Sequence, residues 1–174
     1  IGAGPIGLLA GMIAQAYGAH AILLDLVDER LQFAKELGIE YVINSKTEDT
    51  VKRISEITNG VMAQQVMECS GANAAIRSTL DLVSNAGRIT LTGWPKTETP
   101  LPTDLITKKE VDIRGARTSA GEFEEVIELI HSGKVDIKKI LTKVISIDEA
   151  PATIVDIEKN PGNYMKVVVQ VNEP

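Results

Sequence analysis

The sequence alternates between short aliphatic segments, typical of strands, and longer segments with helical periodicity. The strand-like segments span 20–25, 40–45, 63–70, 87–93 and 111–116, and the helix-like segments span 5–17, 29–37, 48–58, 73–84, 103–109 and 122–130. Two S-x-x-E sequences, Ser45–Glu48 and Ser119–Glu122, have the capping-box spacing of helix starts. Strands that alternate with helices through short connections form a parallel sheet with helices on both faces. We therefore expect an α/β fold with a doubly wound parallel sheet of about six strands.

The first residues, IGAGPIG, contain the G-x-G-x-x-G spacing of a nucleotide-binding turn. Gly2 would permit the tight turn, Gly4 would let the backbone approach a pyrophosphate, and Gly7 would let helix and strand pack closely. The helix that follows offers free N–H groups and a positive dipole end at its N-terminus. The three glycines alone are a weak signal, but the βαβ context that follows them predicts a dinucleotide site.

Asp25 ends the first strand-like segment, close to the offset of about 20 residues at which dinucleotide-binding domains carry an acidic residue. Its carboxylate would accept hydrogen bonds from the 2′-hydroxyl of the adenosine ribose and repel a 2′-phosphate. Positions 26 and 27 hold no Arg or Lys that could bind such a phosphate. The sequence favours NAD over NADP, and the alternative is that Asp25 only ends a strand or caps a helix.

Composition excludes several other classes. The formal net charge of -6 argues against a nucleic-acid partner, and no apolar run reaches the ~20 residues of a membrane span. The single cysteine, Cys69, excludes an internal disulfide and a Cys₄ zinc site, so a reducing, cytoplasmic location is expected. Neither His20 nor His131 has a cysteine or carboxylate at ligand spacing, and we assign no metal site.

Five motifs, GAGPIG, DLVDERLQFAKELG, ECSG, GRITLTG and VDIRGAR, together resemble the medium-chain zinc-type alcohol dehydrogenases, in particular the sorbitol (polyol) and threonine dehydrogenases. The resemblance covers essentially the whole chain. It implies that residues 1–133 form a Rossmann NAD-binding domain with a truncated first strand. Residues 134–174 would return to a GroES-like catalytic domain that precedes this domain in the full enzyme. That domain would supply the zinc ligands, so the segment is expected to contain no catalytic residue and to be inactive alone.

The resemblance also implies which residues bind the cofactor. Around the pyrophosphate it places Gly2, Gly4, Pro5, Ile6 and Gly7. On the adenosine side it places Asp25, Arg30, Cys69 and Ser70. Near the nicotinamide it places Leu91, Thr92 and Gly93, and near the carboxamide or pyrophosphate Ala116 and Arg117. Alternatively, Arg30 and Arg117 are ordinary surface charges, and Cys69 is a small buried residue.

These inferences favour an NAD-dependent oxidoreductase that transfers a hydride from a secondary, polyol-like alcohol to NAD, with zinc in the full-length enzyme. One alternative is a zinc-free quinone reductase of the same superfamily, a class that usually prefers NADP. Another is a non-catalytic Rossmann module that senses NAD. The resemblance further implies a homo-oligomer, a dimer or tetramer, in which residues 96–105 lie near the edge where sheets of two subunits meet.

Overall fold

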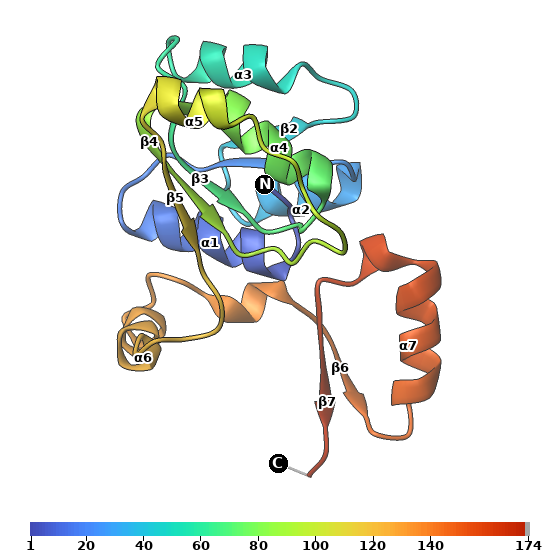
Figure 1. Cartoon of the computed structure of the whole chain (residues 1–174). Helices are drawn as coiled ribbons and strands as arrows, with labels where there is room; N and C mark the ends of the chain where they lie inside the picture. Colours follow the sequence, from blue (N-terminus) through green and yellow to red (C-terminus); the bar gives the residue numbers. More distant parts are fainter. Residues whose placement is uncertain (173–174) are drawn as a thin grey trace. The chain divides into compact units, whose positions relative to one another are not determined.

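The computed structural model describes residues 1–172, which form two compact units, Ile1–Glu122 and the chain from Phe123 onward (Figure 1). In the first unit, strands and helices alternate without interruption. Its elements are α1 (Pro5–Ala16), β1 (Ile22–Asp25), α2 (Asp28–Glu36), β2 (Tyr41–Asn44), α3 (Thr50–Ile57), β3 (Ala63–Glu68), α4 (Asn73–Leu82), β4 (Val83–Leu91), α5 (Thr103–Lys109) and β5 (Asp112–Gly115). Each segment that the sequence predicts within residues 1–122 is present and of the expected type.

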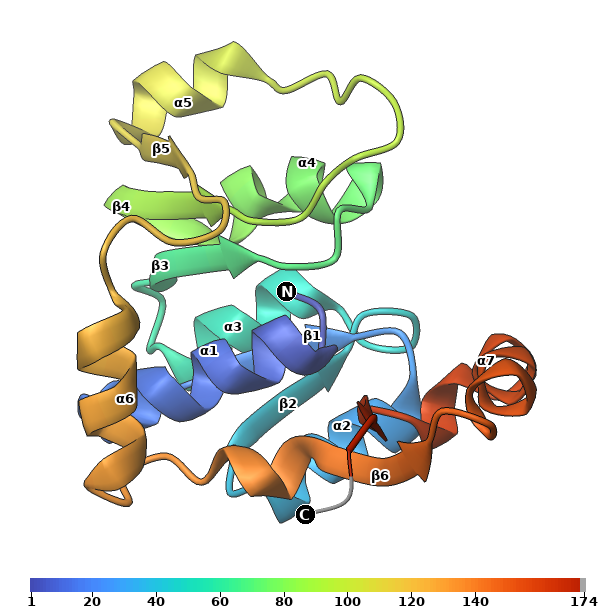
Figure 2. The same cartoon turned by 90° about the horizontal axis from the view of Figure 1, so that it is seen from below.

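All strand pairs of the first unit are parallel. β1 pairs with β2, and β4 pairs with both β3 and β5. Ile1 and Gly2 lie between the two groups, since Gly2 N donates to Leu24 O (2.7 Å) and Cys69 N donates to Ile1 O (2.8 Å). The order across the unit is therefore β2, β1, the first residues, β3, β4 and β5, which Figure 2 shows from below. This is the doubly wound order, and it confirms the predicted fold class.

The core shows that helices cover both faces of the strands. Leu23 and Leu24 are neighbours in β1 and point to opposite faces, yet both are buried. In Figure 1, α3, α4 and α5 lie on one side of the strands and α1 lies on the other. The principal cluster consists of Leu24, Ile43, Ile54, Val66, Leu80, Leu82, Val83 and Ile89. Burial of each such side chain contributes about 1.5–3 kcal/mol, which is why short aliphatic strands dominate the sequence pattern.

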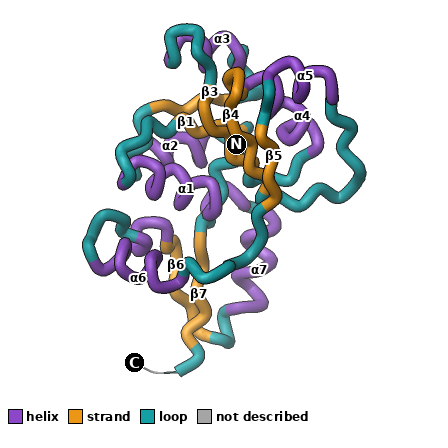
Figure 3. The backbone as a smooth tube through the Cα atoms, turned by 60° about the vertical axis from the view of Figure 1, so that its left-hand side comes forward, coloured by secondary structure: helices purple, strands orange, loops and turns teal. Residues whose placement is uncertain are grey.

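The second unit is a smaller βαβ arrangement. Its elements are α6 (Phe123–His131), the 3₁₀ helix Ile137–Ile140, β6 (Leu141–Ser146), α7 (Ala150–Lys159), the 3₁₀ helix Pro161–Asn163 and β7 (Lys166–Gln170). β6 and β7 are parallel and joined through α7, as Figure 3 shows. By its contacts α6 belongs to this unit. The predicted boundary after residue 133 refers to the domains of a longer enzyme and stays a prediction.

Three local details differ from the sequence-based expectation. The predicted Ser119–Glu122 box does not start α6, since that helix begins at Phe123 and Glu122 Oε2 accepts the N–H of Ala120 (2.6 Å). The start of α3 is capped by Asp49, whose Oδ1 accepts a hydrogen bond from Lys52 N (3.0 Å), and not by the predicted Ser45–Glu48 box. Glu48 instead accepts the N–H of Asn44 (2.8 Å) through its Oε1. The helix expected over 73–84 ends at Leu82, because β4 already begins at the next residue.

Candidate functional site

The carboxyl ends of the strands form one edge of the first unit, and the predicted cofactor residues lie along it. The register pairs Glu68 of β3 with Leu91 of β4, and Leu91 with Gly115 of β5. Ala116 continues the row, since its N–H donates to Leu91 O (2.9 Å). Asp25 closes β1 on the other side of the first residues. In open parallel sheets, ligands bind outside this edge at the point where the strand order reverses.

The glycine turn occupies that point of reversal. Gly2 has φ +96°, a left-handed conformation that a residue with a side chain rarely adopts. A Cβ on Gly7 would lie 1.8 Å from Gly2 O, so α1 can approach the turn only with glycine there. A Cβ on Gly4 would have no atom within 4 Å. Packing therefore explains two of the three glycines, whereas Gly4 borders open space.

The N-terminus of α1 directs free donors into the same region. Leu8 N makes the first intrahelical bond, to Gly4 O (2.9 Å). The N–H groups of Ile6 and Gly7 precede this bond and have no carbonyl partner within the helix. The first turn carries no acidic side chain, so its partial positive charge is not neutralised locally. The turn suits an anion such as a pyrophosphate.

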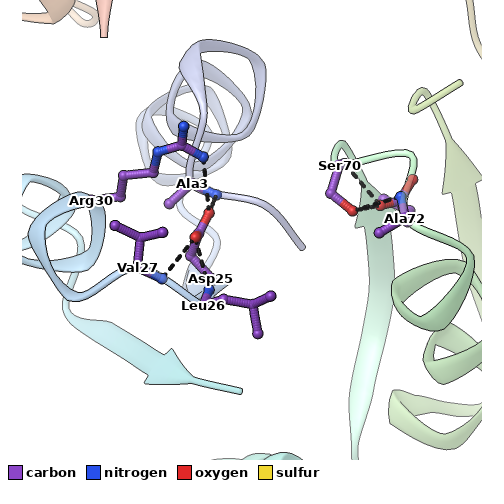
Figure 4. Close-up of polar contacts among 8 residues, drawn as sticks. Ala3, Asp25, Leu26, Val27, Arg30, Ser70 and Ala72 are labelled. Carbon is purple, nitrogen blue, oxygen red and sulfur yellow. Dashed lines mark hydrogen bonds and ion pairs between the residues drawn. The ribbon is translucent and has the colours of Figure 1, made fainter. Parts of the chain in front are cut away.

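Asp25 connects the glycine turn to the end of β1. Its Oδ2 accepts the N–H of Ala3 (2.6 Å), and its Oδ1 accepts the N–H groups of Leu26 (2.7 Å) and Val27 (3.0 Å), as Figure 4 shows. The side chain is only 9% exposed. The carboxylate therefore has the strand-end role that the sequence left open as the alternative. Its two oxygens offer about four acceptor positions, so one remains for a ligand hydroxyl.

Arg30 lies beside this carboxylate, with its terminal nitrogen 3.9 Å from Asp25 Oδ2 (Figure 4). Its Nε is buried and has no hydrogen-bond partner. A buried donor without an acceptor is unfavourable by roughly 1–3 kcal/mol. The place of Arg30 near the adenosine ribose stays a prediction, with an ordinary surface charge as the alternative.

Glu68, the last residue of β3, was missed by the sequence-based reasoning. Its side chain is fully buried. Oε1 accepts the N–H groups of Ser70 (2.8 Å) and Gly71 (3.1 Å), and the Ser70 hydroxyl also donates to it. The carbonyl oxygen of Glu68 accepts the N–H groups of Thr92 (2.9 Å) and Gly93 (3.0 Å). Its place at the end of β3, on the same face as the buried Val66 and at the same edge as Asp25, was the signal that could have identified it.

The remaining predicted residues lie at this edge with varied surroundings. Cys69 is a free, partly buried thiol whose backbone pairs with the first residue. The Arg117 guanidinium stacks 4.5 Å from the ring centroid of Trp94, which is largely exposed. Ser70 Oγ accepts the N–H of Ala72 (3.2 Å; Figure 4), so its hydroxyl is already engaged. Contact of these residues with a cofactor stays a prediction.

Within residues 1–172, no group of three or more His, Cys, Asp or Glu side chains is arranged to hold a metal ion. None of the helices in that range has the length and apolar character needed to cross a membrane.

Comparison with known proteins identifies the family. The sequence profile of the zinc-binding dehydrogenases matches residues 5–132. An uncharacterized zinc-type alcohol dehydrogenase-like protein of Haemophilus influenzae is 54% identical over 167 residues, which is 96% of this chain and 49% of the relative. The sorbitol dehydrogenase of Bacillus subtilis is 33% identical over 174 residues, 99% of this chain and 49% of the relative.

The solved structures agree. The chain matches a structure of a short chain alcohol dehydrogenase of Escherichia coli CFT073, complexed with NADH, with a TM-score of 0.90 and 27% identity. The match covers 98% of this chain and 50% of that one, so the chain spans about half the length of the relatives it matches. The resemblance read from the five motifs is thereby confirmed, and the chain belongs to the medium-chain zinc-type alcohol dehydrogenase family.

Proposed function

We propose that this chain is the NAD(H)-binding part of an oxidoreductase that transfers a hydride from a secondary, polyol-like alcohol to NAD. The observation that carries the proposal is the hydrogen bond from Ala3 N to Asp25 Oδ2 (2.6 Å), which joins the glycine turn to the acidic strand end. A dinucleotide needs both features side by side, the glycine turn for its pyrophosphate and the acidic strand end for its ribose. NAD, when bound, supplies the hydride acceptor, and the chain supplies binding and orientation.

The residues of the edge fit the successive parts of a dinucleotide. The N–H groups of Ile6 and Gly7, with the open space at Gly4, suit the pyrophosphate. The remaining acceptor position of Asp25 suits the adenosine ribose, and the Arg30 guanidinium lies beside that carboxylate. The loops after β4 and β5, with Leu91, Thr92, Gly93 and Ala116, then extend toward the nicotinamide.

The substrate class and the zinc rest on relatives. Several matching proteins are named for polyols or related sugars, among them the sorbitol dehydrogenase of Bacillus subtilis and the D-xylulose reductase of Saccharomyces cerevisiae. Because this chain spans half of such proteins, the zinc ligands and most of the substrate pocket are proposed to lie outside it. A homo-oligomeric, cytoplasmic enzyme is proposed on the same basis.

Parallel titrations with NADH and NADPH test the proposal. Trp94 is exposed near the predicted nicotinamide end, so its emission and its energy transfer to the reduced nicotinamide report binding. We expect saturable NADH binding that is at least about tenfold tighter than NADPH binding, because the Asp25 carboxylate repels a 2′-phosphate. Equal affinities would remove Asp25 from the ribose role and favour the quinone reductase alternative. Failure of NADH to bind would refute the proposed binding site.

A charge introduced beside Asp25 sharpens the test. Leu26 is 61% exposed and follows Asp25 directly, so Leu26→Arg places a cation where a 2′-phosphate would lie. We expect this variant to bind NADPH several-fold more tightly, with an effect that fades at high salt. Val61→Arg is the matched control, since Val61 is 59% exposed and precedes β3, at the opposite edge of the strands. An equal gain in NADPH affinity in Val61→Arg would show that the added positive charge attracts NADPH nonspecifically.

A further inference from the structure

Glu68 carries a buried carboxylate that has no role in the proposed function. Its side chain is completely buried, whereas most glutamates of globular proteins lie in water. Such a group is unfavourable in an apolar interior unless hydrogen-bond donors surround it. The donors here come from one short segment directly after β3, namely Ser70 N, Ser70 Oγ and Gly71 N. Gly71 N also lies 3.1 Å from the second carboxylate oxygen, Oε2.

The same residue holds a second loop. The carbonyl oxygen of Glu68 accepts hydrogen bonds from Thr92 N (2.9 Å), Gly93 N (3.0 Å) and Thr92 Oγ1 (2.8 Å). Glu68 therefore fixes the loop after β3 through its side chain and the loop after β4 through its backbone. These two loops carry the residues that the family resemblance places on the adenosine and nicotinamide sides.

The two loops touch each other around this carboxylate. A Cβ on Gly93 would lie 2.2 Å from Gly71 N and 2.4 Å from Glu68 Oε2. A Cβ on Gly71, at φ +71°, would lie 2.7 Å from Trp94 O. The loops therefore pack backbone against backbone, and the Glu68 carboxylate contacts both of them. A change in the carboxylate would be transmitted directly to the segment Thr92–Trp94.

We propose that Glu68 is a positioning residue, which sets the loops Ser70–Gly71 and Thr92–Gly93 at the cofactor edge and thereby fixes the nicotinamide half of the bound dinucleotide. This inference rests on the proposed function, because it presumes that NAD(H) lies across that edge. An apolar residue at position 68 would fill the interior equally well. A carboxylate additionally selects one arrangement of the donors that follow it.

Hydrogen exchange in the ligand-free chain gives the first test. The amides of Ser70 and Gly71 lie in a loop, and amides in loops exchange rapidly unless an acceptor holds them. We expect both amides to be protected in the wild-type chain. Glu68→Ala should lose the protection, and Glu68→Gln should retain most of it, since its amide oxygen can replace Oε1. Rapid exchange of both amides in the wild-type chain would overturn the proposal, even where Glu68→Ala fails to fold.

Binding of NADH and ADP gives the second test. We expect Glu68→Ala to weaken NADH binding by about tenfold or more and ADP binding by a smaller factor, because Ser70 lies on the adenosine side and the packed segment Thr92–Trp94 on the nicotinamide side. Glu68→Gln should restore NADH affinity. Thr79→Ala is the matched control, because Thr79 is a buried polar residue whose hydroxyl donates to Ile76 O within α4. A loss of folding alone raises the apparent dissociation constants of NADH and ADP by the same factor, so only an unequal change of the two indicates the positioning role.

The outcomes separate the two proposals. Equal weakening of NADH and ADP by Glu68→Ala, or no weakening of either, would overturn the positioning role while the proposed function stands. A wild-type chain that binds neither NADH nor ADP would refute the proposed function. In that case, exchange protection at Ser70 and Gly71 would still show whether Glu68 orders the loops. The proposed positioning role would nevertheless be refuted, because there would be no bound dinucleotide to position.

Discussion

Alanine at Gly4 and alanine at Gly7 should have opposite effects, one on ligand binding and one on folding. A Cβ on Gly7 would lie 1.8 Å from Gly2 O and 3.0 Å from Gly2 C. Ordinary contacts between non-bonded heavy atoms are about 3.5 Å, so α1 and the turn would have to separate by well over an ångström. A Cβ on Gly4 meets no atom within 4 Å, and its φ of −76° is open to any residue.

The magnitudes follow from these distances. Overpacking of an interior contact typically lowers the free energy of unfolding by about 1–3 kcal/mol. The loss of stability in Gly7→Ala should lie near the upper end of this range, because the atoms that the new methyl group meets, Gly2 O and Gly2 C, belong to the backbone and cannot rotate away. Gly4→Ala loses a favourable N-cap glycine, but it gains about 0.4–1 kcal/mol by restricting the unfolded chain. Its free energy of unfolding should therefore stay within about 1 kcal/mol of wild type.

Urea unfolding followed by circular dichroism, together with NADH titration, measures both effects. We expect Gly7→Ala to be clearly destabilised. Gly4→Ala should unfold like wild type yet bind NADH at least about tenfold more weakly, since its methyl group enters the space proposed for the pyrophosphate. NADH binding by Gly4→Ala at wild-type affinity would refute that placement. Unchanged stability of Gly7→Ala would refute the close packing of helix and turn.

Three further predictions concern stability. Leu80→Ala, at a completely buried core position, should lower the free energy of unfolding by about 2–5 kcal/mol in urea, and a change under about 1 kcal/mol would contradict its core role. Lys109 donates through Nζ to two carbonyl oxygens at the α4–β4 junction (2.7 and 2.9 Å), so Lys109→Met should cost about 1–3 kcal/mol in the same assay. Hydrogen bonds from Arg114 and, to a smaller extent, Arg88 lower the pKa of Asp112. The ionised Asp112 therefore stabilises the folded chain at pH values above the ordinary pKa of aspartate, and this stabilisation is lost as the pH falls through the lowered pKa. The difference in urea midpoint between wild type and Asp112→Asn should therefore stay constant from about pH 7 to about pH 5 and shrink as the pH falls below about 4, and a difference that stays constant at still lower pH would contradict it.

Periodicity made the first unit predictable. Its strands are short because each crosses a thin interior, and adjacent apolar residues such as Leu23 and Leu24 indicate burial on both faces. This double burial requires helices on both sides, which fixes the doubly wound class once the segments alternate. The spacing from the glycines to Asp25 then identified the edge where the site lies, because carboxyl ends of parallel strands meet there.

Details that depend on tertiary contacts were not predictable. Ser45–Glu48 has the spacing of a capping box, yet Asp49 caps α3. The conformation of the turn before the helix decides which residue occupies the N-cap position, and sequence spacing does not show that conformation. Glu68 shares a face of β3 with the buried Val66, yet a glutamate is ordinarily solvent-facing. Its burial arises from the loops after β3 and β4, which fold over it. The second unit gave weaker signals, because many of its apolar side chains remain exposed in this chain.

Asp25 and Glu68 end neighbouring stretches of the cofactor edge, yet they differ in what they leave for a ligand. Asp25 accepts three backbone N–H groups and keeps one acceptor position, which suits a ribose hydroxyl. Glu68 is fully buried and engaged by Ser70 and Gly71, so it acts on a ligand only through the loops that it holds. The start of α1, next to Asp25, presents free N–H groups and a positive dipole end with no acid in its first turn. ADP fills the ribose and pyrophosphate places but leaves the loops after β4 and β5 without a partner, so ADP should bind more weakly than NADH in the wild-type chain.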